Sequence, residues 1–423
     1  MSTAQRLLVL AVAAVVATAA KICRPLDPEC CQPSLCPGWE WRTHGGLPPF
    51  PDAWGPPRWG MAASTVAYFV GNASGLNNDM ERTFGSKLGY YGIGWELNNI
   101  PANMTHLEEA EETEAKALKA LNPEMRVGVT RNSVVLTTFW DSAKEKMEDP
   151  AYNHFWLQCD GKPCTNVWGL DEPCPRDPKN PASCDPTSFM MNFSNPEFAD
   201  WYVYEYVGQA ANNSLFDAVY FDAGVNVSVA TDLDLQAYIV DSQRTFDRAY
   251  ELLTAKGKWA SSWVGFGTES TSGSPYNGID ASSCAATLPR LIEEGANANH
   301  TLQMQTTAFG LCQRHRGGGC RRQGGGAFDQ STPWPHSPQD QDSTVAAFMI
   351  ARGPSALLEM VVFGAYFFAS DLTFPSTLST DYGPPLGLAT QTGSVFERKF
   401  ERGTVRLDCS TWKSTFEAHS SDA

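Results

Sequence analysis

The chain has 423 residues, of which 42% are hydrophobic and 18% are charged, and its formal net charge is -16 at pH 7. An acidic surplus of this size argues against nucleic acid or an anionic membrane as a partner, because both require a positively charged protein surface. A neutral ligand such as a sugar is compatible with it.

Residues 1–19 have the pattern of a signal peptide. Arg6 precedes the apolar run Leu7–Val16, and the small residues Ala17, Thr18 and Ala19 follow it. The run is shorter than the roughly 20 apolar residues that a membrane-spanning helix needs. We therefore expect a secreted protein or one retained in the lumen of the secretory pathway, with a single-pass anchor as the less favoured alternative.

Cysteines and glycosylation motifs agree with an oxidising compartment. The chain has 12 cysteines, and several are close in sequence: Cys23/Cys30/Cys31/Cys36, Cys159/Cys164, Cys174/Cys184 and Cys312/Cys320. Spacing alone does not assign the disulfide pairs, and none of these clusters has the repeated spacing of a zinc site. Asn-x-Ser/Thr sequons occur at Asn72, Asn103, Asn192, Asn212, Asn226 and Asn299.

Residues 20–60 are rich in Cys and Pro and predict an extension, after which short apolar segments alternate with helical ones. The predicted strands are Val66–Val70, Leu88–Ile93, Arg126–Thr130, Ala218–Phe221, Ala260–Phe266, Leu302–Thr306, Ala346–Ile350 and Ala365–Ala369. The clearest predicted helices are His106–Ala120, Pro196–Ala211, Leu233–Lys256 and Ala281–Glu294. Gln313–Gln341 is rich in Gly, Arg and Gln and predicts a surface loop, unless it is a retained intron.

This alternation fits an α/β fold, either a closed barrel or an open doubly wound sheet. The glycine-rich motifs of nucleotide-binding open sheets are missing from the sequence, which favours the barrel. We predict a (β/α)8 TIM barrel over residues 61–410 with a Cys/Pro-rich N-terminal extension and a tail over residues 411–423.

The strongest candidate for chemistry is Asp222, at the end of the predicted strand Ala218–Phe221. Catalytic groups of such barrels lie at the carboxyl ends of the strands, where the loops converge. The small residues Ala223 and Gly224 follow it and would let a ligand approach. The alternative is an Asp that only caps the next turn.

Three pieces of sequence resemble the glycosyl-hydrolase-like TIM-barrel families and their α-galactosidase-like relatives. They are Phe193-Ser-Asn-Pro-Glu-Phe-Ala-Asp-Trp-Tyr-Val, Phe216-Asp-Ala-Val-Tyr-Phe-Asp-Ala-Gly and Phe396-Glu-Arg-Lys-Phe-Glu-Arg-Gly-Thr-Val. The resemblance covers residues 60–408 and is more specific as an ordered set than in any single piece. It implies that Asp222 takes the place of the fourth-strand carboxylate, which acts as nucleophile in such relatives. Ala218 departs from the Gly that is usual in the family.

Glycoside hydrolysis normally needs a second carboxyl group as general acid. Our candidates, in order, are Glu269, Glu96 and Asp371, which follow the predicted fifth, second and eighth strands. Many barrel glycosidases carry the acid on the sixth strand, but Gln303-Met-Gln-Thr-Thr contains none.

Four further residues are candidate substrate ligands, together with Asp371. Arg131 and Asn132 follow the third predicted strand, where the guanidinium could orient hydroxyls or form a structural ion pair. Trp95 and Trp140 could stack on a sugar ring, although most of the 13 tryptophans must serve packing.

We therefore expect a secreted glycoside-hydrolase-like protein that cleaves O-glycosidic bonds with paired carboxylates, without cofactor or metal. The sequence has no metalloprotease or serine-hydrolase motif, and its seven histidines lack metal spacing. Two alternatives stay open: a catalytically inactive carbohydrate-binding barrel, and a structural secreted glycoprotein.

Overall fold

The computed structural model describes residues 48–76, 79–98, 107–133, 135–138, 140–164, 188–222, 234–262, 279, 281–299, 301–306, 338–360 and 376–419. The predicted signal peptide, Cys23 to Cys36, Cys174/Cys184, Cys312/Cys320 and the strand predicted at 365–369 lie outside these residues. So does most of the predicted loop 313–341, whose last residues, 338–341, begin a helix.

The main element is a sheet of seven parallel strands in the order β10-β11-β1-β2-β3-β8-β9. Its strands are β1 (Thr65–Asn72), β2 (Tyr90–Asn98), β3 (Arg126–Asn132), β8 (Ala218–Asp222), β9 (Trp259–Ser262), β10 (Leu302–Thr306) and β11 (Ala356–Met360). An α/β fold with a parallel sheet is confirmed, and the strands follow the predicted apolar segments except at the seventh position.

The strand order is that of a singly wound sheet. It follows the chain from β1 to β9 without reversal, and the late strand β11 pairs with β1, the first. An open doubly wound sheet instead reverses its order at a switch point. The connectivity is therefore that of a barrel, although the described residues contain no ladder between β9 and β10 and so do not show a closed eight-stranded cylinder.

Packing on one face shows that the sheet is rolled. Tyr90, Ala218, Tyr220, Trp259 and Leu357 form one buried cluster. Tyr90 on β2 and Trp259 on β9 are three strands apart, which would separate their backbones by about 14 Å in a flat sheet at about 4.8 Å per strand. Their rings nevertheless meet edge to face at 5.9 Å between centroids, which indicates a curved sheet with this face inside.

Residues 48–54 cover the amino end of this interior. Phe50 and Trp54 pack against the inner cluster. The carbonyl of Pro48 accepts hydrogen bonds from Trp259 Nε1 at 2.8 Å and from Thr301 Oγ1 at 2.6 Å. Trp259 begins β9 and Thr301 precedes β10, so this carbonyl holds together the two strands that end the sheet order.

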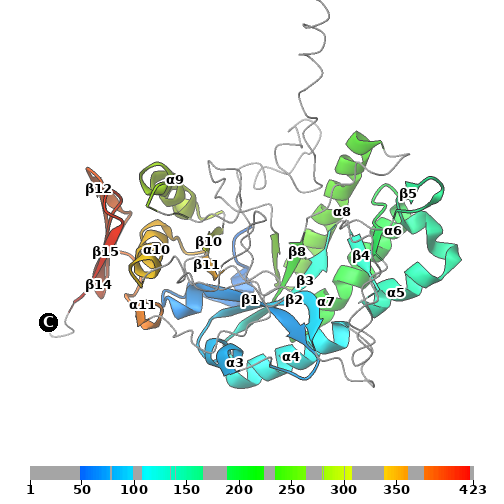
Figure 1. Cartoon of the computed structure of the whole chain (residues 1–423), viewed down its shortest axis with the longest axis horizontal. Helices are drawn as coiled ribbons and strands as arrows, with labels where there is room; N and C mark the ends of the chain where they lie inside the picture. Colours follow the sequence, from blue (N-terminus) through cyan, green and yellow to red (C-terminus); the bar gives the residue numbers. More distant parts are fainter. Residues whose placement is uncertain are drawn as a thin grey trace, which may run out of the picture.

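Helices cover the outer face (Figure 1). They are α3 (Asp79–Gly85), α4 (Leu107–Leu121), α6 (Pro196–Trp201), a π-helical segment (Tyr202–Val207), α7 (Gly208–Asn212), α8 (Leu235–Ala255) and α9 (Cys284–Ala296). The predicted helices are thereby confirmed. Side-chain capping explains where α6 and α8 begin. The side chain of Asn195 accepts hydrogen bonds from the N–H groups of Glu197 and Phe198, and that of Asp234 accepts from the N–H of Ala237.

The strand predicted at Ala346–Ile350 is wrong, because these residues belong to α10 (Pro338–Ala351). Residues 343–351 are all buried, since α10 is enclosed by α9 on one side and the C-terminal strands on another. A short apolar run of a fully buried helix has no polar face to reveal its period. The seventh strand is β11, which follows this helix.

A separate antiparallel sheet lies beside α10, at the left of Figure 1. It has the order β12-β13-β14-β15, with β12 (Thr390–Thr392), β13 (Val395–Phe400), β14 (Gly403–Asp408) and β15 (Lys413–Ala418). The predicted barrel boundary at 410 falls inside this sheet, and the predicted tail contains β15. A disulfide from Cys284 to Cys409 links α9 to it, and another joins Cys159 to Cys164.

The remaining elements are short. They are the 3-10 helices at Asp52–Trp54, Ala62–Ser64 and Pro150–Phe155, the helices α5 (Asp141–Glu148) and α11 (Ser376–Ser379), and the paired strands β4 (Val135–Thr137) with β7 (Ser188–Met190) and β5 (Gln158–Cys159) with β6 (Lys162–Pro163). Within the described ranges, no helix has both the length and the apolar character needed to span a membrane.

Candidate active site at the carboxyl ends of the strands

Asp222 is the last residue of β8, at the carboxyl end of the parallel sheet. Along this strand Ala218 and Tyr220 belong to the inner cluster, whereas Val219 and Phe221 belong to the outer core. Because strand residues alternate between faces, position 222 shares the inner face with Ala218 and Tyr220. The backbone therefore places Asp222 at the end of the sheet and on the face where a barrel ligand would bind; its side chain lies outside the described part.

Asn132 stands beside position 222, because the two residues are in register at the ends of β3 and β8. Its backbone is held by two tyrosines: its N–H donates to Tyr206 Oη at 3.2 Å, and its carbonyl accepts from Tyr202 Oη at 3.0 Å. Its Oδ1 accepts from the N–H of Val135 at 2.9 Å. This part of the strand end is therefore firmly positioned.

Trp95 and Glu96 lie in a bulge near the carboxyl end of β2. Val70 pairs with Gly94 and the next residue, Gly71, pairs with Leu97, so Trp95 and Glu96 are additional residues in the register. Bulges bend a strand locally and are over-represented beside active sites. The backbone thus places Glu96 two strands from Asp222, on an irregular part of the same end; the side chains of both residues are outside the described part.

Arg131 has the structural role that the sequence left open as its alternative. It is 1% exposed, and its Nη1 donates to both carboxylate oxygens of Glu111 at 2.9 Å. Burial raises the pKa of Glu111 to about 8, against the opposing effect of Arg131. The pair lies between β3, α4 and the π-helical segment, so Arg131 does not reach a ligand at the strand ends.

Trp140 is also enclosed, with 0% exposure. Its ring meets that of Tyr206 edge to face at 5.6 Å between centroids. A side chain with no accessible surface cannot stack on a sugar, so Trp140 belongs to the packing tryptophans. Glu269 and Asp371 lie outside the described residues, and their predicted roles remain predictions.

Glu359 is a candidate that the sequence analysis missed. It is the penultimate residue of β11 and is in register with Gln305 of β10 and Val66 of β1. Position 359 shares the alternation of Leu357, which belongs to the inner cluster. The error at 346–350 hid it, because assigning a strand there leaves residues 356–360 as a connection.

The described residues contain no group of three or more His, Cys, Asp or Glu side chains that could hold a metal ion. The backbone brings the positions of Glu96, Asn132, Asp222 and Glu359 to the carboxyl end of the sheet, and of their side chains the structure describes that of Asn132.

No protein-family model matches the chain, and no curated protein matches it. Among solved structures it is similar to the sucrose 6F-phosphate phosphorylase of Thermoanaerobacter thermosaccharolyticum, with 9% identity, a TM-score of 0.45 and coverage of 84% of this chain and 95% of that one. An alpha-amylase from Lactobacillus plantarum has 8% identity and a TM-score of 0.42 over 82% of this chain and 88% of the amylase.

A GH31 dextranase of Flavobacterium johnsoniae complexed with glucose has 11% identity and a TM-score of 0.39, over 87% of this chain and 53% of that one. The chain thus spans about half the length of the dextranase. Scores of this size do not establish a shared fold, so the fold rests on the strand order and the inner packing described above.

Proposed function

We propose that the chain is a glycoside-hydrolase-like protein, with Asp222 as the ionised carboxylate at the open end of the rolled sheet. The observation that supports this is the position of Asp222: the last residue of a central strand, on the inner face, and in register with Asn132. In barrels of this connectivity the carboxyl ends of the strands carry the chemistry.

Glu96 is the best supported second carboxyl group among the described positions. Its strand is two steps from that of Asp222, which corresponds to a backbone separation of about 10 Å at about 4.8 Å per step. Paired carboxyl groups of glycosidases are about 5 to 9.5 Å apart, a range that two acidic side chains can reach from such backbone positions. Glu359 on β11, four strands from β8 in the sheet order, is the alternative second carboxyl group.

The proposed reaction is hydrolysis at an anomeric carbon. The ionised Asp222 would attack this carbon or activate a water molecule, while the protonated partner donates its proton to the leaving oxygen. The glycosidic bond breaks, and water supplies the hydroxyl and the proton that complete the products. In the nucleophilic route, water releases Asp222 and returns a proton to the partner; in the water-activating route Asp222 gains the water proton and the partner loses its own, and exchange with solvent restores both.

The test is hydrolysis of a panel of aryl glycosides by the wild type, Asp222→Asn and Asp217→Asn. Asp217 is the matched control, because it immediately precedes the strand that Asp222 ends. At this amino end its carboxylate accepts from the Val127 N–H at 2.9 Å and from Lys119 Nζ at 2.6 Å. We expect Asp222→Asn to lose at least about 1,000-fold in kcat/KM with an unchanged melting temperature. Asp217→Asn should lower the melting temperature and keep the activity of the folded protein.

Equal rates for the wild type and Asp222→Asn on every hydrolysed substrate would contradict the proposal. The same holds if no glycoside is cleaved while saccharide binding persists in both proteins, which would indicate the carbohydrate-binding alternative.

A further inference from the structure

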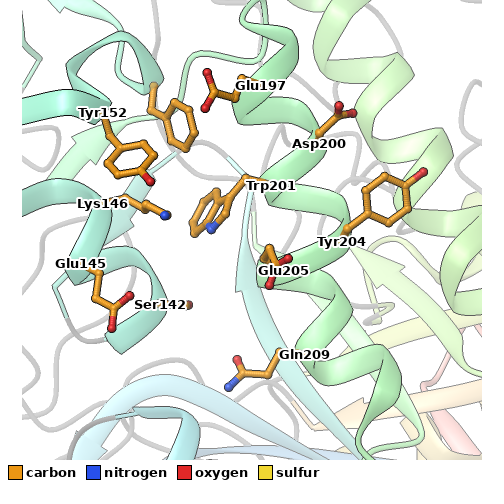
Figure 2. A pocket seen from close by; sticks show the side chains of 11 residues that line it. Ser142, Glu145, Lys146, Tyr152, Glu197, Asp200, Trp201, Tyr204, Glu205 and Gln209 are labelled. Carbon is orange, nitrogen blue, oxygen red and sulfur yellow. The ribbon is translucent and has the colours of Figure 1, made fainter. Parts of the chain in front are cut away.

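A groove lies on the outer face of the molecule, between α5 and the continuous helix of residues 196–212 (Figure 2). Its volume is about 600 Å³, within the range of small-molecule sites. It is lined by Ser142, Glu145, Lys146, Tyr152, Phe155, Glu197, Asp200, Trp201, Tyr204, Glu205 and Gln209. None of these residues belongs to the strand ends that carry Asp222.

The π-helical segment aligns one row of this lining. Glu197, Trp201, Glu205 and Gln209 follow one another at intervals of four residues. In an α-helix with 3.6 residues per turn such a row drifts around the axis by roughly 40° per step. The wider turn of the π-helix at Tyr202–Val207 counteracts this drift, and π-helical turns are frequent at functional sites.

Trp201 is the central residue of the groove and carries an unused hydrogen-bond donor. Its side chain is 9% exposed, stacked on Tyr206 at 5.8 Å and packed against Phe155 and Phe198. Figure 2 shows its indole between α5 and the helix that bears it. The described residues give its Nε1–H no acceptor, and this atom is not among the fully buried donors that lack one, so the N–H is accessible from the groove. A fixed donor in a groove indicates a ligand with an acceptor oxygen.

The cation sites of the groove are already occupied. Lys146 lies 3.9 Å from the centre of the Tyr152 ring, and Arg248 lies over Tyr204 while pairing with Asp200. A cationic ligand would therefore find both tyrosine faces covered, and it would offer no acceptor to Trp201. The acidic lining likewise disfavours an anion.

We propose that this groove binds a neutral oligosaccharide. Sugar hydroxyls donate and accept at once, so they can satisfy the Trp201 N–H together with the carboxylate of Glu205 and the amide of Gln209. The side chains of Glu205 and Gln209 make no hydrogen bond with other described residues. The aromatic groups beside them provide a surface for the apolar face of a pyranose. This site is separate from the strand ends and does not depend on hydrolysis there.

The experiment titrates the full-length Asp222→Asn protein with maltopentaose, cellopentaose, laminaripentaose and isomaltopentaose by isothermal calorimetry and tryptophan fluorescence. We expect at least one to bind with a change in fluorescence. Adding Trp201→Phe, which keeps an aromatic group but replaces the larger indole and removes its N–H, should weaken binding measured by calorimetry at least tenfold. Glu205→Gln, a surface substitution that leaves the packing intact, should weaken it several-fold. Glu148→Gln, on α5 but outside the groove, should have no effect.

Absence of binding for all four saccharides at 10 mM would overturn the proposal, as would unchanged affinity in both groove variants. Tighter binding of spermine than of any saccharide, lost in Glu205→Gln, would show a cation site instead. Binding is measured in the Asp222→Asn protein, so the groove test does not depend on hydrolysis at the strand ends. Failure of the strand-end proposal therefore leaves the groove test intact.

Discussion

Asp217 and Asp222 carry the same side chain at opposite ends of β8, about 17 Å apart along the strand at about 3.3 Å per residue. Asp217, just before the strand, accepts from the backbone of Val127 and pairs with Lys119 and Arg126. These contacts tie three sequence segments together at the amino end, where barrel residues serve stability. The position in the strand, rather than the residue type, distinguishes a structural aspartate from a candidate catalytic one.

Lys258 provides a pH-dependent test at the residue scale. Its Nζ donates to the carbonyl oxygens of Asn213 and Phe216, and burial lowers its pKa to about 8. An unfolded lysine titrates near 10.4. Between pH 8 and 10 the unfolded chain therefore binds more protons at this position than the folded one, and the free energy of unfolding should rise with pH through this window.

The measurement is urea unfolding at pH 7, 8, 9 and 10 for the wild type, Lys258→Met and Lys256→Met. We expect the rise between pH 8 and 10 to be smaller in Lys258→Met than in the wild type. Lys256 is its exposed neighbour, and its positive charge adds to the lowering of the Lys258 pKa, so Lys256→Met should reduce the rise less than Lys258→Met does. Parallel curves for all three proteins would show that Lys258 titrates alike in both states.

At the scale of elements, α10 depends on an arginine from a neighbouring strand. The Arg398 Nη1 donates to the carbonyls of Met349, Ile350 and Arg352 at 3.2, 3.0 and 2.5 Å, where the helix leaves its last carbonyls without intrahelical partners. Arg398 is 6% exposed, so water cannot replace it.

We expect Arg398→Met to lower the free energy of unfolding by about 3 kcal/mol, because it leaves several buried carbonyl groups without a hydrogen-bond donor. Arg406 on β14 is the control: it is 43% exposed and bonds to Glu397 and Glu417 at the surface. Exposed ion pairs contribute little, so Arg406→Met should change stability only slightly. Chemical denaturation monitored by circular dichroism compares the two, and equal losses would contradict the capping role.

The elements that the sequence predicted well are those with a visible period or cap, such as α4 and the helix that starts at Asn195-Pro196. The error at Ala346–Ile350 arose where burial on all sides removes the period, and it concealed β11 and with it Glu359. The ion-pair partner of Arg131 could not be predicted from the sequence, because Glu111 belongs to a different element of the fold. Nor does spacing reveal the disulfide between Cys284 and Cys409, whose sequence separation is 125.

The outer groove was missed for a related reason. Glu197, Trp201 and Glu205 recur every four residues, a spacing that also suits an ordinary amphipathic helix. Only the π-helical turn and the position of α5 turn this row into a lined groove. Candidate sites at strand ends follow from topology, whereas a site between helices depends on how the helices are placed.

At the scale of the whole molecule, the rolled sheet brings together two strands from the ends of its order. Trp259 and Thr301 both donate to the carbonyl of Pro48, which comes from a segment more than 200 residues earlier in the chain. Thr301 Oγ1 also lies 2.5 Å from Ser355 Oγ, before β11. One carbonyl thus joins the amino ends of β9 and β10.

This arrangement predicts non-additive substitutions. Trp259→Phe or Thr301→Val alone leaves the Pro48 carbonyl with one donor. The first should cost about 1 kcal/mol from the lost hydrogen bond, and the second, which also loses the bond to Ser355 Oγ, about 2 kcal/mol, plus any loss of packing. The double variant leaves this buried carbonyl without either donor. Its loss in free energy of unfolding should exceed the sum of the two single losses by about 1 kcal/mol or more. Additive losses in a double-mutant cycle measured by urea unfolding would mean that the two strand ends do not share this acceptor. The excess, in contrast, would be direct solution evidence that the sheet curves far enough for its outermost strands to meet.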